Sequence, residues 1–208
     1  MAINLQKGQK IDLTKGGKGL TGVMVGLGWD EVQRPQSGGG FFSRLRSQPQ
    51  PADIDCDASA ILLGENGKLY GSKAEDFLVY YGNLRHWSGA IAHQGDNLTG
   101  EGEGDDEQIM VDLTGVPSDV AKIVFVVNIY DASTRGQHFG MIQNAFIRLV
   151  DLSNGQEICR FNLSENYFGM TGMIVAEIYR YKGEWKFNAV GQPVREASRV
   201  DNLVKMYV

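Results

Sequence analysis

The chain has 208 residues, 42% of them hydrophobic, and carries 25 Asp and Glu against 20 Lys and Arg, a formal net charge of −5. This is enough apolar material for one large domain or two small ones. The acidic balance gives no support for nucleic-acid binding, and no apolar run approaches the roughly 20 residues of a membrane-spanning helix. Residues 1–8 lack the basic start and apolar stretch of a secretory signal, so we expect a cytoplasmic protein whose cysteines, Cys56 and Cys159, are reduced and buried.

Short strand patterns dominate the chain. Residues 23–27 place alternate apolar side chains on one face, and residues 123–127 form a continuous apolar run typical of a strand buried on both faces. About ten strands are predicted by such patterns, at residues 11–13, 23–27, 53–63, 77–81, 109–113, 123–127, 145–150, 157–161, 173–179 and 185–190.

Turn residues separate these segments. Asn66-Gly67 and Asn154-Gly155 predict hairpin turns of type I′, in which both central residues need positive φ, and Lys182-Gly183 marks a further turn. Short strands at regular spacing therefore predict an all-β fold, a β-sandwich of two mostly antiparallel sheets with long acidic loops.

Two regions depart from the strand pattern. Residues 33–51 contain Gly38-Gly39-Gly40 and three prolines, which predicts a flexible surface insertion; arginines around Phe41-Phe42 leave a partner-docking loop as the alternative. Near the C-terminus, apolar residues fall at helical spacing. Residues 198–207 are therefore predicted to form a short amphipathic helix with Ser198 as its N-cap.

An acidic, glycine-rich run at residues 95–107 is the most informative stretch. It holds six carboxylates in thirteen residues and no basic residue. Like charges this close repel, so ordering them requires either a cation or full exposure to water. Glycines let the backbone turn its carbonyls inward, and calcium binds six to eight such oxygens at about 2.4 Å. A solvated acidic loop is the plain alternative.

A second acidic cluster favours the cation. In residues 53–63, Asp53, Asp55 and Asp57 alternate with apolar residues, so three carboxylates would line one face of a strand. Because Asp is depleted in strands, this pattern favours a compensating ion over a plain solvent-facing edge. Nine of the 25 acidic residues lie in the two clusters, leaving 16 against 20 Lys and Arg, so the negative charge is localised.

Other chemistries fit less well. Residues 96–107 have the length of an EF-hand loop, but Leu98 and Gly100 stand where side-chain ligands belong and Glu101 where glycine is needed. Acidic residues between the glycines would repel a phosphate. Neither a zinc-ligand spacing nor a nucleophile with its own base is recognisable.

Taken together, the segments resemble the TerD family of tellurium-resistance and stress-response proteins. The resemblance rests on short motifs along residues 1–191. They are Asn4-Leu5-Gln6-Lys7-Gly8-Gln9, Val25-Gly26-Leu27-Gly28-Trp29-Asp30, Asp55-Cys56-Asp57-Ala58-Ser59-Ala60, His93 to Gly100 with Asp105-Asp106-Glu107, Asn144-Ala145-Phe146-Ile147-Arg148 and Gly183-Glu184-Trp185-Lys186-Phe187.

The resemblance implies a β-sandwich domain over residues 1–191 that binds calcium between its loops, usually two ions. The insertion at 33–51 is long for the family, and residues 192–208 form a C-terminal extension beyond the family pattern. The metal ligands carried over by matching positions are Asp30, Asp55, Asp57, Asp96, Asn97, Asp105, Asp106 and Glu107, with backbone carbonyls of Gly100 and Gly102 added.

The function expected from this resemblance is calcium-stabilised assembly with other tellurium-resistance proteins, some of them at the inner membrane, without catalysis. Two alternatives use the same carboxylates. One is a magnesium-dependent phosphoester hydrolase with His93 as its base, and the other is a calcium-dependent membrane-surface binding module. The sequence leaves the oligomeric state open.

Overall fold

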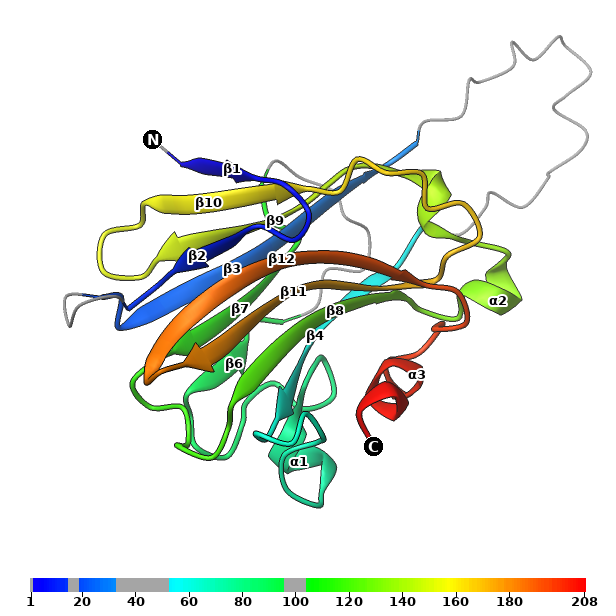
Figure 1. The fold of residues 1–208 in the computed structure, drawn as a ribbon. Coiled ribbons are helices and arrows are strands. Elements are labelled where there is room, and N and C mark those ends of the chain that lie inside the picture. Colours follow the sequence, from blue (N-terminus) through cyan, green and yellow to red (C-terminus); the bar gives the residue numbers. More distant parts are fainter. Residues whose placement is uncertain (1, 15–18, 33–52, 96–103) are drawn as a thin grey trace, which may run out of the picture.

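In the computed structural model, residues 2–14, 19–32, 53–95 and 104–208 are described, and they form two six-stranded β-sheets packed face to face (Figure 1). Sheet A has the order β1 (Ile3–Leu5), β10 (Glu157–Asn162), β9 (Ile142–Asp151), β3 (Gly22–Glu31), β7 (Glu107–Asp112) and β6 (Ile91–His93). Sheet B has the order β2 (Lys10–Asp12), β12 (Glu184–Val194), β11 (Gly172–Tyr181), β8 (Lys122–Ile129), β4 (Cys56–Leu63) and β5 (Leu78–Val79).

The predicted β-sandwich is confirmed. Among the described residues, neighbouring strands pair antiparallel except β1 with β10, which are parallel. The strands β1 and β6, of three residues each, were not among the predicted segments. The insertion predicted at residues 33–51 lies outside the described residues.

Alternation along the strands builds the core between the sheets. In β4, Cys56, Ala58, Ala60 and Leu62 face this core, as their alternate spacing predicts. The run in β8 divides between two faces: Ile123, Phe125 and Val127 enter the core between the sheets, while Val124 and Val126 point to the outer face of sheet B. The interpretation of residues 123–127 as a strand buried on both faces is therefore confirmed.

A second apolar cluster covers that outer face. The helices α1 (Ala74–Phe77) and α3 (Val200–Val204) pack there, with Val200 and Leu203 of α3 against Ile61 of β4. Figure 1 shows α3 close to the C-terminus, on the side of sheet B away from sheet A. A 3-10 turn, η4 (Lys205–Tyr207), follows, so the short C-terminal helix is confirmed. Burial of α3 explains why so short a helix is stable.

Two local predictions were wrong. Helix α3 is preceded by Arg199 without a side-chain cap, while Ser198 Oγ lies 2.8 Å from Ser133 Oγ. In the Asn-Gly turns only Gly67 and Gly155 have positive φ, so these turns are not type I′. Both residues of Lys182-Gly183 have positive φ, at 53° and 79°, which is the type I′ pattern.

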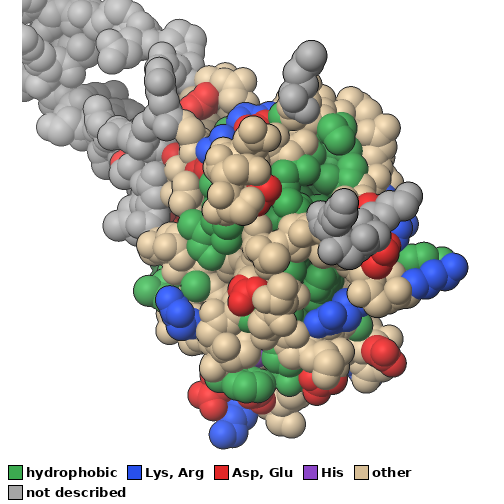
Figure 2. Space-filling view, turned by 90° about the vertical axis from the view of Figure 1, so that its left-hand side faces the viewer, with side chains coloured by type: hydrophobic (Ala, Val, Ile, Leu, Met, Phe, Trp, Pro, Cys, Tyr) green, Lys and Arg blue, Asp and Glu red, His purple; other side chains and the backbone are tan. Residues whose placement is uncertain are grey.

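The remaining short elements are α2 (Ala132–Arg135), after β8, and the 3-10 helix η3 (Phe139–Met141), before β9. No helix in the described part of the chain is long and apolar enough to span a membrane. On the face shown in Figure 2, the described Lys and Arg side chains are interspersed with Asp and Glu, without a large area of one sign.

Candidate metal centre

The structure describes six of the ten residues predicted to hold calcium. Asp96, Asn97, Gly100 and Gly102 lie outside the described residues. Within residues 2–14, 19–32, 53–95 and 104–208, no three His, Cys, Asp or Glu side chains are grouped closely enough to hold a metal ion.

Glu107 lies at the junction of the two sheets. It begins β7 in sheet A, its side chain is 1% exposed, and its Oε2 accepts the backbone N–H of Ala58 in sheet B at 2.5 Å. β5 pairs with β4 only at Ala60 and Ile61, so β4 has no β5 partner at Ala58. Glu107 thus supplies the acceptor that an edge N–H needs, and it fixes a carboxylate at this edge of the sandwich.

His93 lies beside Glu107 and is fully buried. Its Nδ1 accepts the backbone N–H of Gly95 at 3.2 Å, which assigns the ring proton to Nε2. Nε2 in turn lies 3.4 Å from Glu107 Oε2. A buried imidazole that turns its N–H toward a carboxylate is placed to orient that carboxylate, and it does not present a free base to a substrate.

Asp106 continues the site toward β3. Its backbone N–H donates to the Leu27 carbonyl at 2.8 Å, and its Oδ2 accepts the Trp29 N–H at 2.7 Å. Burial raises the pKa of Asp106, and the charges of Asp30 and Asp105 raise it further, against the Trp29 hydrogen bond that lowers it. Asp30 itself is exposed, with Oδ2 accepting from Asn144 Nδ2 at 2.7 Å.

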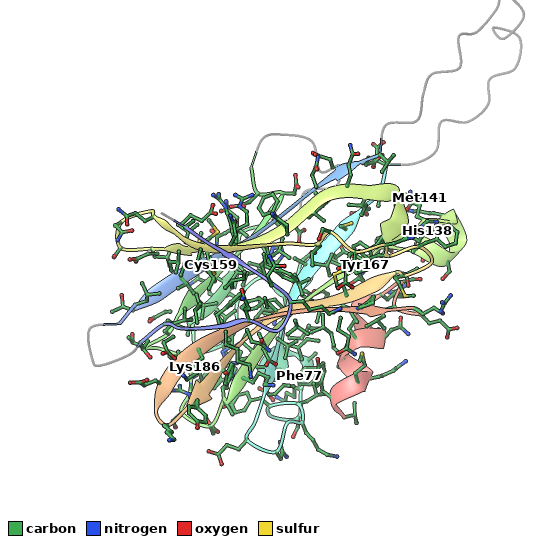
Figure 3. All side chains as sticks on the ribbon, turned by 45° about the horizontal axis from the view of Figure 1, so that its top comes forward. Phe77, His138, Met141, Cys159, Tyr167 and Lys186 are labelled. Carbon is green, nitrogen blue, oxygen red and sulfur yellow. The ribbon has the colours of Figure 1, made fainter. Side chains whose placement is uncertain are left out.

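The Cys56 thiol lies within electrostatic reach of several of these carboxylates. Burial raises its pKa well above the usual value, and the negative charges of four carboxylates raise it further; in decreasing order these are Glu107, Asp57, Asp55 and Asp106. Asp55 and Asp57 adjoin Cys56 in the chain, so the informative members are Glu107 and Asp106, whose charges reach the thiol from the acidic run. The other thiol, Cys159, lies on β10 in sheet A (Figure 3), where burial raises its pKa to about 12. Both cysteines are free, as predicted.

Asp105 points away from this group. Its side chain is fully buried on the outer face of sheet A, where Arg148 donates to both carboxylate oxygens at 2.7 and 2.8 Å. Gly26 makes room for it, because a Cβ there would lie 2.4 Å from the carboxylate. Arg148 also contacts Glu157 at 3.1 Å, and both carboxylates raise its pKa. Sequence reasoning missed Arg148, although it stands in one of the matched motifs.

Asp55 and Asp57 lie on the other side of β4 from the core. Asp55 precedes the strand and lies 3.9 Å from Arg135. Asp57 shares the outward face with Ile61, is 4% exposed, and accepts from Asn128 Nδ2 at 3.0 Å. The sequence predicted Asp53, Asp55 and Asp57 along one face of a strand. In the structure Asp53 is exposed, Asp55 is half-buried and Asp57 is buried, so the three carboxylates do not share one environment.

The fold and the site define a class: a two-sheet β-sandwich with the neighbouring carboxylates Asp106 and Glu107 held at one edge. The TerD domain family matches residues 1–207, and the chain belongs to the TerD family of tellurium-resistance and stress-response proteins. The resemblance seen in the sequence motifs is thereby confirmed.

Relatives of known name match nearly the whole chain. The chain is 56% identical over 208 residues to the stress response protein SCP2 of Bacillus subtilis, covering all of both chains. It is 45% identical over 192 residues to the tellurium resistance protein TerD of Serratia marcescens, covering 92% of this chain and 91% of that one. A crystal structure of a TerD homologue from Streptomyces coelicolor superposes with a TM-score of 0.66 at 19% identity, covering 91% and 99% of the two chains, which supports the fold.

Proposed function

We propose that this chain is a calcium-binding stress-response protein that acts through metal-stabilised assembly with partners and not through catalysis. The observation that carries the proposal is the pair Asp106 and Glu107, two neighbouring carboxylates held at the end of the acidic run by backbone N–H groups of different sheets. Glu107 is buried and Asp106 is half-buried, and holding two such carboxylates ionised side by side is costly unless a cation lies near.

The donor chemistry fits a hard divalent cation. Asp106, Glu107 and Asp30 would supply carboxylates, and Asp96, Asn97 and the carbonyls of Gly100 and Gly102 would complete the oxygens. We leave Asp55 out because it lies on the other side of β4 from the core, 3.9 Å from Arg135. We leave Asp105 out of the ligand set because Arg148 neutralises it. We leave Asp57 out because its carboxylate faces the outer side of sheet B. Calcium, when bound, would supply the positive charge that relieves the repulsion.

Calorimetric titration of the full chain with calcium, and separately with magnesium, tests this proposal. We expect calcium to bind and to stabilise the folded protein by about 2.7 kcal/mol at a hundredfold excess over Kd. Asp106→Asn should weaken binding, while Asp53→Asn, which changes an exposed carboxylate, should leave it unchanged. Affinity should fall as pH drops toward about 4, because the ligands must be ionised. An unchanged melting temperature after chelator treatment would overturn the proposal.

Partners and location belong to the same proposal. Relatives of this chain bear the name of tellurium-resistance proteins, and we propose assembly with proteins of that system, in the cytoplasm, where free buried thiols such as Cys56 and Cys159 persist. Comparing which proteins co-purify with the tagged chain in calcium and in chelator tests the assembly.

The two alternative functions, a phosphoester hydrolase and a membrane-binding module, have less specific support than calcium binding. The hydrolase needs His93 as an accessible base, whereas its side chain is 0% exposed and turns Nε2 toward Glu107. The membrane-binding module needs a surface that attracts anionic lipid, and the face in Figure 2 carries charges of both signs. Calcium-dependent sedimentation with anionic vesicles would reinstate the second.

A further inference from the structure

A small polar cavity lies on the outer face of sheet B, away from the Glu107 edge. Its volume is about 90 Å³, and it lies between β4, β8 and the start of α3. For comparison, a water molecule in the liquid occupies about 30 Å³. The cavity is therefore sized for a head group of a few heavy atoms.

The floor of the cavity is made of two buried hydrogen-bonding side chains. Asp57 on β4 and Asn128 on β8 are paired in register across the two strands, and they are 4% and 1% exposed. Asn128 Nδ2 donates to Asp57 Oδ2 at 3.0 Å. Asn128 Oδ1 is buried and has no hydrogen-bond partner among the described residues. A buried oxygen acceptor is normally hydrogen-bonded to a donor. Because Asn128 lines the cavity, a donor group can approach its Oδ1 from there.

The walls are aromatic. Tyr80, Tyr81 and Tyr130 line the cavity, and the rings of Tyr80 and Tyr81 stand nearly perpendicular, at 67°, with centroids 5.0 Å apart. Ring faces carry partial negative charge and attract cations. Tyr130 already shows this behaviour, since the Arg135 guanidinium lies 5.4 Å from its ring centroid.

The charges around the cavity favour a cationic guest. Asp57 is buried at the floor, and Asp201 stands at the rim. Arg199 also lines the cavity, but it is exposed. Water therefore screens the positive charge of Arg199 more strongly than the negative charge of the buried Asp57. Burial, followed by the charge of Asp57, raises the pKa of Tyr81, which places that ring within electrostatic reach of the carboxylate.

We propose that this cavity is a binding site for a primary alkylammonium group, held by the Asp57 carboxylate, the Asn128 carbonyl oxygen and the tyrosine rings. A primary ammonium supplies both the positive charge that the rings and Asp57 attract and the N–H donors that Asn128 Oδ1 lacks. A quaternary ammonium would satisfy the rings but not Asn128. The site goes beyond the proposed calcium function, because Asp57 and the cavity lie on the other face of β4 from the core.

Titration of the full chain with butylammonium in the presence of chelator, followed by amide and side-chain NMR shifts, tests the proposal independently of calcium. We expect saturable shifts at Asn128, Tyr80, Tyr81 and Tyr130. Asp57→Asn should weaken binding about tenfold, and Tyr81→Leu about fivefold, in line with one charge contact and one cation–π contact. Tetramethylammonium, which has no N–H, should bind at least about fivefold more weakly.

Matched variants separate recognition from folding. Tyr81 is 41% exposed, so its replacement should leave the fold intact, and Tyr81→Phe, which keeps the ring, should bind like the native chain. Tyr181→Leu removes a tyrosine that is 50% exposed and outside the cavity, and it should have no effect. Free butylammonium and Nα-acetyl-lysine amide carry the same group, and their relative affinities tell a small amine from a lysine side chain.

Three results would overturn the proposal. One is the absence of shifts at the cavity up to about 100 mM butylammonium, which corresponds to a binding free energy of only about 1.4 kcal/mol. Another is binding that persists unchanged in both Asp57→Asn and Tyr81→Leu, with each variant shown to be folded. The third is tetramethylammonium binding as tightly as butylammonium, which would exclude the role given to Asn128.

Discussion

Glu107 joins the two sheets of the sandwich through Ala58: a carboxylate of sheet A accepts a backbone N–H of sheet B at 2.5 Å. The acceptor and the donor lie 49 residues apart in the chain, and both are buried. This contact closes the edge of β4 and places a carboxylate beside Cys56, so the same residue serves the fold and the proposed calcium site.

Replacing Glu107 with Ala should destabilise the protein by about 2–4 kcal/mol, because it leaves a buried N–H without an acceptor and opens a cavity. Glu107→Gln keeps an oxygen that can accept from Ala58, so its loss should be clearly smaller. Urea unfolding in the presence of chelator measures both without any contribution from calcium. Equal losses in the two variants would show that the Ala58 hydrogen bond is not what Glu107 contributes.

A second prediction concerns Gly26, which lies under Asp105. A Cβ on Gly26 would lie 2.4 Å from the Asp105 carboxylate, a carboxylate that Arg148 fixes by two hydrogen bonds. Gly26→Ala should therefore cost about 2 kcal/mol or more, although alanine is otherwise favoured over glycine within a strand. Thermal unfolding measures the loss.

Gly22 provides the matched control in the same strand. A Cβ there would meet Leu152 Cδ1 at 3.1 Å, the end of a flexible side chain that is 48% exposed. Gly22→Ala should change the stability by no more than about 0.5 kcal/mol. If both variants lose the same stability, the Asp105 contact is not the cause.

These contacts show which features the sequence could predict. The alternation in residues 54–62 and the apolar run at 123–127 predict strands and their buried faces, because both depend only on the period of a strand. The gathering of the acidic residues around one cation, predicted from their excess in two clusters, stays a prediction. Local pattern was sufficient for the strands.

The remaining contacts depend on pairings between distant segments. Asp105 belongs to the acidic run, yet Arg148, 43 residues away, removes it from the proposed ligand set. Asp57 is buried beside Asn128 of β8, at a cavity that Val200 of α3 also lines. No spacing within the chain specifies which partner a carboxylate meets, so sequence patterns grouped these acidic residues and the fold separates them.

The third prediction concerns the thiols. Burial is the largest cause of the raised pKa of both Cys56 and Cys159, so the reactive thiolate is scarce at neutral pH. In the native protein neither should react with a disulfide reagent at pH 8 within the time that a small free thiol reacts fully, while both should react after unfolding in urea. Rapid labelling of Cys159 in the folded protein would contradict the expectation. An inert pair also speaks against direct reduction of a tellurium oxyanion by these cysteines.

The fourth prediction is a pH dependence that arises at His86. Its side chain is buried, with Nε2 donating to the Asp76 carbonyl at 2.9 Å and Nδ1 at 2.7 Å from Ser88 Oγ. Burial lowers the pKa of His86 below its usual 6.5, against the Asp76 contacts that raise it. The folded state therefore binds this proton less readily than the unfolded state. The stability due to neutral His86 is complete above about pH 6.5 and is lost as pH falls below that value.

Urea unfolding at several pH values between about 5.5 and 7.5 should show this slope, because most carboxylates titrate below that window. His86→Gln keeps a side chain that can donate to the Asp76 carbonyl but cannot take up a proton. The variant should therefore lose most of the dependence of stability on pH, while its stability at pH 7.5 should stay close to that of the native chain. Parallel curves for the two proteins across the window would assign the acid sensitivity to another group. A steeper curve for the variant would reverse the inferred direction of the His86 shift.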